Sequence, residues 1–170
     1  MGKWNDTDEP IAYLITFRTY GTWLQGDERG SINKYHNKFG GGRAVISPER
    51  ENVHRNRLKS PPFLRNAEAR KIVDESIREV SQFREWPLIA LNVRTNHAHV
   101  VMSATASSAK MLGDFKARST LRLREQDLWG FEHSPWVDKG SRRNLWSEEH
   151  VRRAVNYVVN GQGGPLPDFD

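Results

Sequence analysis

Two histidines separated by a single residue, His97 and His99, stand in the stretch NHAHVVMS of this 170-residue chain. On a strand, side chains two positions apart point to the same face, so the two imidazole rings would lie side by side. A pair placed in this way can supply two ligands of a divalent metal ion. The same spacing also suits two partly buried histidines that are satisfied by neighbouring groups, so the pair alone does not decide the chemistry.

A tyrosine late in the chain offers a second reactive group. Tyr157, in AVNYVVNGQG, is the only one of the four tyrosines that lies outside residues 13–35. A helical tyrosine among apolar neighbours is most often part of a core. Facing a histidine-bound metal ion, however, its phenolic oxygen can attack a phosphodiester whose scissile phosphate the ion polarises.

The composition indicates the class of partner. The chain carries 26 Lys and Arg against 21 Asp and Glu, and its isoelectric point is near 9.7. This charge balance is typical of proteins that bind nucleic-acid phosphates, although a merely basic surface gives the same composition. The absence of cysteine excludes disulfides, thiolate metal sites and a cysteine nucleophile. With neither a signal pattern nor an apolar run of the ~18 residues that a membrane helix requires, we expect a cytoplasmic protein without a membrane partner.

The elements that must position these residues follow from periodicity and from helix-capping residues. The pattern predicts a strand at 11–20, a helix at 66–83 capped by Asn66, strands at 88–93 and 97–103 around a turn at Thr95–Asn96, a helix at 107–129, a short hairpin at 134–147 turning at Lys139–Gly140, and a helix after Ser147. In the helix at 66–83, the predicted apolar face includes Phe83. This order predicts one α+β domain over residues 1–170, with helices packed against a mostly antiparallel sheet.

Basic residues gather in two places. A long excursion at about 21–62 has little periodicity, which is typical of a functional or a disordered loop, and the tail at 163–170 is expected to be flexible. The lysines and arginines of the excursion could contact a polyanion, and its Trp23 and Tyr35 could stack on unpaired bases. Four basic residues of the second predicted helix could follow DNA phosphates: Lys116, Arg118, Arg122 and Arg124.

Three blocks of the chain, in order, resemble the REP-associated tyrosine transposases and their small insertion-sequence relatives, which are HUH-type single-tyrosine transposases. NHAHVVMS resembles the His–apolar–His motif of that family, with the small Ala98 in the middle. YLITFRTYGTWLQGDERG resembles its first strand and glycine-rich continuation, and RRNLWSEEHVRRAVNYVVNGQG its hairpin and tyrosine helix. The resemblance implies the HUH endonuclease fold, a ferredoxin-like antiparallel sheet with helices packed on it.

The resemblance also implies an activity. His97 and His99 look like ligands of Mg²⁺ or Mn²⁺, and Tyr157 looks like a nucleophile that attacks single-stranded DNA, forms a 5′-phosphotyrosine link and frees a 3′-hydroxyl. Relatives recognise DNA hairpins, so single-stranded or hairpin DNA is the expected partner in DNA transposition and recombination. Because both rings must be neutral to bind a metal ion, we expect its affinity to fall as the pH drops through ~6.5.

A third metal ligand is less well defined by the resemblance. Family members often supply an amide one turn after the tyrosine, but here that position is Gly161, which has no side chain. Gln162 is the preferred candidate for this ligand, and Asn160 is the alternative.

Two other functions remain open at this stage. One is a domesticated relative that binds structured DNA without cutting it, and the other is a metal phosphoesterase that uses water and leaves Tyr157 as packing. No nucleotide-binding loop or acidic metal triad is evident, which argues against ATP-driven or carboxylate-triad transposition. The sequence leaves open whether the chain is a monomer or a homodimer, and whether it still mobilises DNA.

Overall fold

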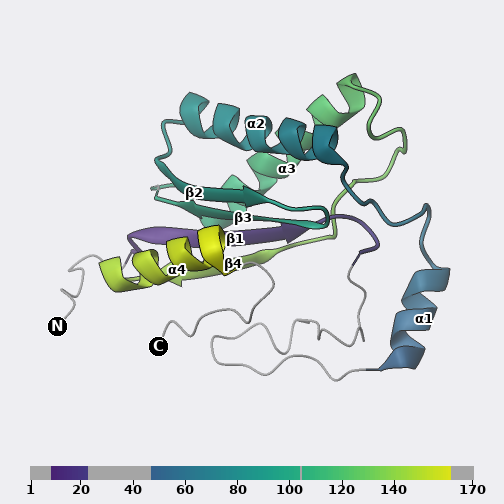
Figure 1. Cartoon of the computed structure of the whole chain (residues 1–170), viewed down its shortest axis with the longest axis horizontal. Helices are drawn as coiled ribbons and strands as arrows, with labels where there is room; N and C mark the ends of the chain where they lie inside the picture. The colour runs from purple at the N-terminus through teal and green to yellow at the C-terminus, as the bar shows by residue number, and fades with distance from the viewer. Residues whose placement is uncertain (1–8, 23–46, 104, 162–170) are drawn as a thin grey trace.

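The computed structural model describes residues 9–22, 47–103 and 105–161. These residues form, in chain order, β1 (Ala12–Arg18), α1 (Pro48–Asn56), α2 (Ala67–Phe83), β2 (Leu88–Val93), β3 (His97–Met102), α3 (Ser108–Glu125), β4 (Ser141–Leu145) and α4 (Glu148–Asn160). Trp23, Tyr35, Gln162 and the predicted tail at 163–170 lie outside the described residues. Of the basic excursion, the described part contains α1, which lies apart from the sheet in Figure 1. In the described part of the chain, no helix combines the length and the apolar character that crossing a membrane requires.

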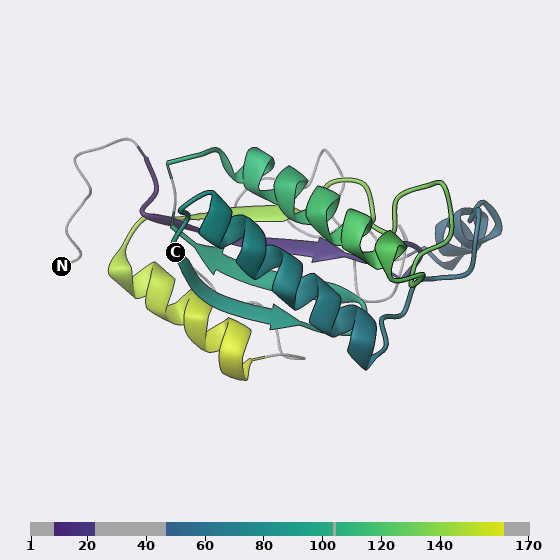
Figure 2. The ribbon, with the colours of Figure 1, turned by 90° about the horizontal axis from the view of Figure 1, so that it is seen from above.

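The four strands form one antiparallel sheet in the order β2-β3-β1-β4. With α2 joining β1 to β2 and α3 joining β3 to β4, this is the ferredoxin-like βαββαβ arrangement. Figure 1 shows α2 and α3 on one face of the sheet and α4 on the other, and Figure 2 shows α2 and α3 side by side above the strands. The predicted α+β class and ferredoxin-like sheet are therefore confirmed.

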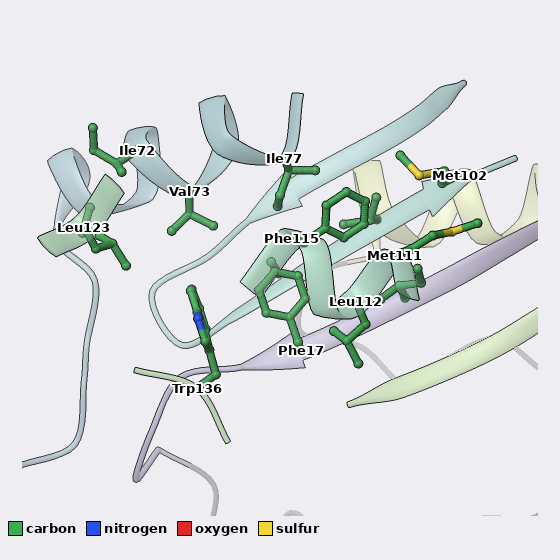
Figure 3. Close-up of a cluster of buried hydrophobic side chains, with 14 of the residues drawn as sticks. Phe17, Ile72, Val73, Ile77, Met102, Met111, Leu112, Phe115, Leu123 and Trp136 are labelled. Carbon is green, nitrogen blue, oxygen red and sulfur yellow. The ribbon is translucent and has the colours of Figure 1, made fainter. Parts of the chain in front are cut away.

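Alternation along the strands divides the core between the two faces of the sheet. On β3, Ala98, Val100 and Met102 belong to the cluster beneath α2 and α3, whereas Val101 belongs to the cluster beneath α4. Figure 3 shows the first cluster, in which side chains from α2 and α3 meet those of the sheet. The second cluster is smaller and consists of Ala12, Leu14, Ala90, Val101, Leu145, Ala154 and Val158.

The predicted helix starts are confirmed by their caps. The Asn66 side-chain oxygen accepts a hydrogen bond from the Ala69 N–H at 2.8 Å, and the Ser147 hydroxyl accepts one from the His150 N–H at 3.2 Å. The prediction that Phe83 belongs to the buried face of α2 is wrong, because its side chain is 81% exposed. The buried aromatic residue at this end of α2 is Trp86 instead, whose ring centroid lies 6.4 Å from that of Phe115.

The second long helix ends earlier than the predicted residue 129. Helix α3 stops at Glu125, and Asp127 has a φ of 55°, a left-handed conformation that does not continue a helix. The Leu128 N–H then donates back to the Leu123 carbonyl at 2.8 Å. The chain thereby folds Trp129 into the core, where it is 4% exposed.

The predicted hairpin at 134–147 is wrong, because both of its arms pair with β1. Trp136 forms a bridge with Thr19, and Ser141 begins β4 opposite Thr16. A turn does occur at Lys139–Gly140, where Lys139 has a φ of 66°, but the chain continues along the same side of β1 after it. Gly140 is required there, since a Cβ atom at this position would lie 2.7 Å from the Thr16 carbonyl oxygen.

Candidate active site

The fold brings the two histidines and the tyrosine into contact. His97 and His99 lie on the face of β3 that α4 covers, with ring centroids 4.7 Å apart. The Tyr157 ring, on α4, lies edge-on to His99 with a centroid distance of 5.2 Å and an interplanar angle of 75°. The prediction that the two imidazoles lie side by side is confirmed. Tyr157 contacts His99 from α4, a later part of the chain.

A row of polar residues crosses the sheet at the level of His99. The strand register places Ser141 of β4 opposite Thr16 of β1, Thr16 opposite His99 of β3, and His99 opposite Asn92 of β2. Residues paired across antiparallel strands share a face, so all four side chains lie on the face that α4 covers. The adjacent row on this face contains the apolar core residues Leu14, Val101 and Ala90. The polar row therefore marks the boundary between the α4 core and the site.

His99 is held in its neutral form. It is 4% exposed, and its Nδ1 atom lies 2.7 Å from the Thr16 hydroxyl oxygen. Burial lowers the pKa of His99 to about 3, with further lowering by the positive charges of His97, Arg18 and Arg94. We therefore expect the His99 ring to remain available as a metal ligand well below pH 6.5. When its Nδ1–H donates to the Thr16 hydroxyl, the lone pair is on Nε2.

The partner of His97 defines its tautomer. The Nδ1 atom of His97 lies 2.7 Å from the side-chain oxygen of Asn96. An amide oxygen only accepts hydrogen bonds, so this contact places the proton on Nδ1 and leaves the lone pair on Nε2. Hydrogen bonds of this kind orient metal-binding histidines in proteins. The two rings thus fit a divalent ion, because each can present one imidazole nitrogen to it.

The described part of the chain offers no acidic cluster as a source of further ligands. Within residues 9–22, 47–103 and 105–161, no group of three or more His, Cys, Asp or Glu could hold a metal ion. Of the two predicted amide ligands, Gln162 lies outside the described residues, and Asn160 is exposed and donates to the Asn156 side chain at 3.0 Å. The assignment of the third ligand stays a prediction.

Arg65 supports the β2–β3 turn, and sequence reasoning missed it. Its guanidinium donates to the Arg94 carbonyl from Nε at 3.0 Å and to the His97 carbonyl from Nη2 at 2.6 Å, while its backbone N–H donates to the Thr95 carbonyl at 2.9 Å. Arg65 is 1% exposed and forms no ion pair with a carboxylate in the described part of the chain. Burial and the nearby charge of Arg70 lower its pKa to about 9. A buried guanidinium therefore fixes the turn that leads into His97.

Thr19 anchors Asn96, the residue of the β2–β3 turn that precedes His97. The carbonyl oxygen of Asn96 accepts from the Thr19 N–H at 2.9 Å and from the Thr19 hydroxyl at 3.2 Å. The residue whose side chain orients His97 is thus itself anchored to the end of β1. Thr19 is fully buried, and the sequence gives it no distinction from any other strand threonine.

The four basic residues predicted to bind DNA lie on α3, and Figure 1 shows this helix on the face of the sheet opposite to α4. Arg118 pairs with Glu79 at 2.8 Å, and Arg122 pairs with Glu75 at 3.2 Å and also with Glu79. The Lys116 amine donates to the carbonyls of Val137 and Lys139. The Arg124 guanidinium donates to those of Phe131 and Glu132. Each therefore has a structural role within the chain, and its role in DNA binding stays a prediction.

The charges near the histidines favour an anionic ligand. Arg18 is the register partner of His97 on β1 and lies on the same face. The charged groups that act on His99 are Arg18, Arg94 and His97, and all of them lower its pKa. A phosphate group is the kind of ligand that such an environment attracts.

Comparisons with known proteins concern the fold. The sequence matches no protein-family model and no curated protein. In structure, the chain is similar to a candidate transposase from Deinococcus radiodurans R1, at 14% identity and a TM-score of 0.44 over 97% of this chain and 100% of the other. It is also similar to a REP-associated tyrosine transposase bound to a REP hairpin, at 10% identity and a TM-score of 0.47 over 93% of this chain and 70% of the other. Both similarities are distant, so the function has to be inferred from the residues of the site.

Proposed function

We propose that this chain is a metal-dependent single-stranded DNA endonuclease of the HUH tyrosine transposase type, which cleaves and rejoins DNA through a 5′-phosphotyrosine intermediate. The observation that carries the proposal is the contact between Tyr157 and His99, which brings the proposed nucleophile to the neutral member of a pair of adjacent imidazoles. The resemblance of three sequence blocks to the family supports the same assignment.

The chemistry assigned to Tyr157 is a reversible transfer. Its phenolic oxygen attacks the scissile phosphorus, the bond from phosphorus to the 3′ oxygen breaks, and the proton that the phenol loses is balanced by the one that the 3′-hydroxyl gains. The 5′ phosphate is then linked to Tyr157, and attack by a 3′-hydroxyl reverses the step and rejoins the strand. Because the phosphodiester bond energy is kept in the link, no nucleotide cofactor is needed.

His97 and His99 would hold Mg²⁺ or Mn²⁺ through Nε2. When bound, the ion supplies Lewis-acid polarisation of the scissile phosphate. Because these ions prefer oxygen ligands and the described site has no carboxylate cluster, we expect DNA phosphate oxygens to complete their coordination. Arg18 and Arg94 add positive charge where the phosphate would lie. Single-stranded DNA, including strands that carry a hairpin, is the substrate proposed.

The test is covalent capture of Tyr157. A labelled oligonucleotide with a hairpin beside a single-stranded segment is incubated with the protein and Mn²⁺ and run on a denaturing gel. The wild type should give a slowly migrating adduct, and Tyr157→Phe should give none, since it keeps the ring and removes only the hydroxyl. Tyr13→Phe is the matched control, because Tyr13 packs on the α2–α3 side of the sheet and should leave the adduct intact.

The outcomes separate the three functions. Release of free ends by the wild type without an adduct would support the water-using phosphoesterase. Tight hairpin binding without any cutting would support the DNA-binding protein. Persistence of the adduct in Tyr157→Phe would show that another residue is the nucleophile.

A further inference from the structure

A hydrogen bond links the strand beside His99 to the helix that carries Tyr157. Asn92 lies on β2 directly opposite His99, and its side-chain Nδ2 donates to the backbone carbonyl of Val158 at 2.9 Å. Val158 follows Tyr157 in the last turn of α4. One side chain thus joins the neighbour of the candidate metal ligand to the neighbour of the candidate nucleophile.

This hydrogen bond is made to a carbonyl group in the last turn of α4. The last four carbonyl groups of an α-helix have no partner within the helix and must find one elsewhere. In α4, the Tyr157 carbonyl accepts from the Gly161 N–H at 2.9 Å, and the Val158 carbonyl accepts from Asn92. Asn92 therefore acts as a cap for α4 that comes from the sheet.

The rest of the contact between α4 and the sheet is largely apolar. Ala154 and Val158 are fully buried against Val101 and Leu145. Apolar contacts are non-directional, so they constrain the position of α4 along its axis and its rotation less sharply than a hydrogen bond does. A hydrogen bond requires a defined distance and angle, and it can fix both.

We propose that Asn92 is a positioning residue that docks the last turn of α4 so that the Tyr157 side chain lies against His99. This inference rests on the proposed function for the role of Tyr157, and it adds a residue that neither the motif nor the family resemblance marks. The amino group of Asn92 is the part that acts, since it is the donor to Val158.

Two substitutions separate the amino group from the rest of the side chain. Asn92→Asp keeps the size and the oxygen but replaces the donor with a second acceptor, which faces the Val158 carbonyl. Asn92→Ala removes both polar atoms and adds no charge. The matched control is Asn144→Asp, which makes the same change at an exposed position of β4 on the opposite face of the sheet.

The first measurement needs neither metal nor DNA. Hydrogen exchange followed by mass spectrometry compares the amides of residues 157–161 with those at the start of α4. Because a hydrogen bond is worth about 1 kcal/mol net, its loss should speed exchange in the last turn about fivefold in both Asn92 variants. Exchange at the start of α4 should stay unchanged, as should the whole helix in Asn144→Asp. Unchanged exchange in both Asn92 variants would overturn the proposal.

The second measurement addresses the site. At saturating DNA and Mn²⁺, the rate of formation of the Tyr157 adduct should fall about fivefold or more in both Asn92 variants. The affinity of Asn92→Ala for Mn²⁺ should stay within about twofold of the wild type, because both histidines are intact. A loss of Mn²⁺ affinity as large as that of His97→Ala would identify Asn92 as a metal ligand, and faster exchange with an unchanged adduct rate would show that the bond does not position Tyr157. Either result would overturn the proposal.

If the wild type forms no adduct, the proposed function fails, and the exchange measurement still decides whether Asn92 holds α4.

Discussion

The hydroxyl group of Thr16 lies 2.7 Å from Nδ1 of His99, across the central pair of strands and out of contact with solvent. Thr16 is separated from His99 by 83 positions in the chain. The bond orients the imidazole and leaves Nε2 as the nitrogen available to a ligand. Because the bond is buried, its loss would leave a polar nitrogen without a partner, which is costly.

Replacing Thr16 with valine should weaken metal binding without removing a ligand. Valine has the same shape as threonine but cannot form the hydrogen bond to the His99 imidazole. The Mn²⁺ affinity in the presence of DNA should therefore fall about 10-fold. This loss should be smaller than that of His97→Ala or His99→Ala, which each remove a nitrogen. Titration of Mn²⁺ by calorimetry or electron paramagnetic resonance measures all three, with exposed Thr105→Val as the control. Unchanged affinity in Thr16→Val would show that the hydroxyl does not orient His99, and unchanged affinity in both histidine variants would exclude the metal site.

The metal-free protein should lose stability on acidification because of His99. Its pKa is about 3 in the folded chain, while an unfolded histidine has its ordinary value near 6.5. Between these values only the unfolded chain binds the proton, so stability is complete above pH 6.5 and falls as the pH decreases towards 3. The largest slope from one such group is about 1.4 kcal/mol per pH unit.

Urea unfolding at pH 7.5, 5.5 and 4.5, in the presence of a chelator, measures this slope. His99→Gln keeps a polar side chain beside Thr16 and removes the titrating ring, so its free energy of unfolding should depend less on pH. Equal slopes for the wild type and His99→Gln would contradict the assignment of the effect to His99.

Arg65 should be important for the stability of the turn that leads into His97. Arg65→Met removes the guanidinium donors to the Arg94 carbonyl and should cost about 1–3 kcal/mol, the range for a buried polar group left without a partner. Arg65→Lys should recover only part of this, because an ammonium group cannot reproduce the planar fork. Chemical denaturation of both variants, with exposed Lys71→Met as the control, checks the prediction. If Arg65→Met were as stable as the wild type, the guanidinium would not support the turn.

DNA binding should be tighter for a single strand with a hairpin than for a plain duplex of the same sequence, and it should weaken steeply as salt rises. The four basic residues of α3 can be tested one at a time by the slope of the logarithm of DNA affinity against the logarithm of salt concentration. Replacing a residue that contacts a phosphate with glutamine should reduce the steepness of this slope by about one. A variant such as Arg118→Gln that loses stability but keeps the slope would have only its structural role, the ion pair with Glu79.

The regular elements could be predicted from the sequence because their signals are local. Alternation marked β1 and β3, and capping side chains marked the starts of α2 and α4. The single-residue spacing of the histidines placed both rings on one face, and the structure confirms this. Their meeting with Tyr157 was expected from the family resemblance, since periodicity alone does not say where α4 packs.

The remaining features depend on contacts between distant parts of the chain. Trp136 pairs with Thr19 rather than with the strand that follows it, so a local pattern suggested a hairpin that does not exist. Arg65 lies between the basic excursion and α2 and has no distinguishing local pattern, yet its side chain is buried where it donates to the carbonyls of the β2–β3 turn. Asn92 has no distinguishing neighbour in the sequence, because its partner Val158 is known only once α4 is placed on the sheet.

The sheet order has a consequence for the biosynthesis of the protein. Both neighbours of β1 in the sheet, β3 and β4, leave the ribosome after it, and α4 follows β4. Strand β1 can therefore be paired on both sides only after β4 has been synthesised. Pairing between strands that are far apart in the sequence forms slowly. A translation product that stops before Glu148 carries both histidines but not Tyr157. The order of synthesis thus places the proposed nucleophile after the strands that carry the candidate metal ligands, and a chain that ends before Tyr157 could not carry out the proposed chemistry.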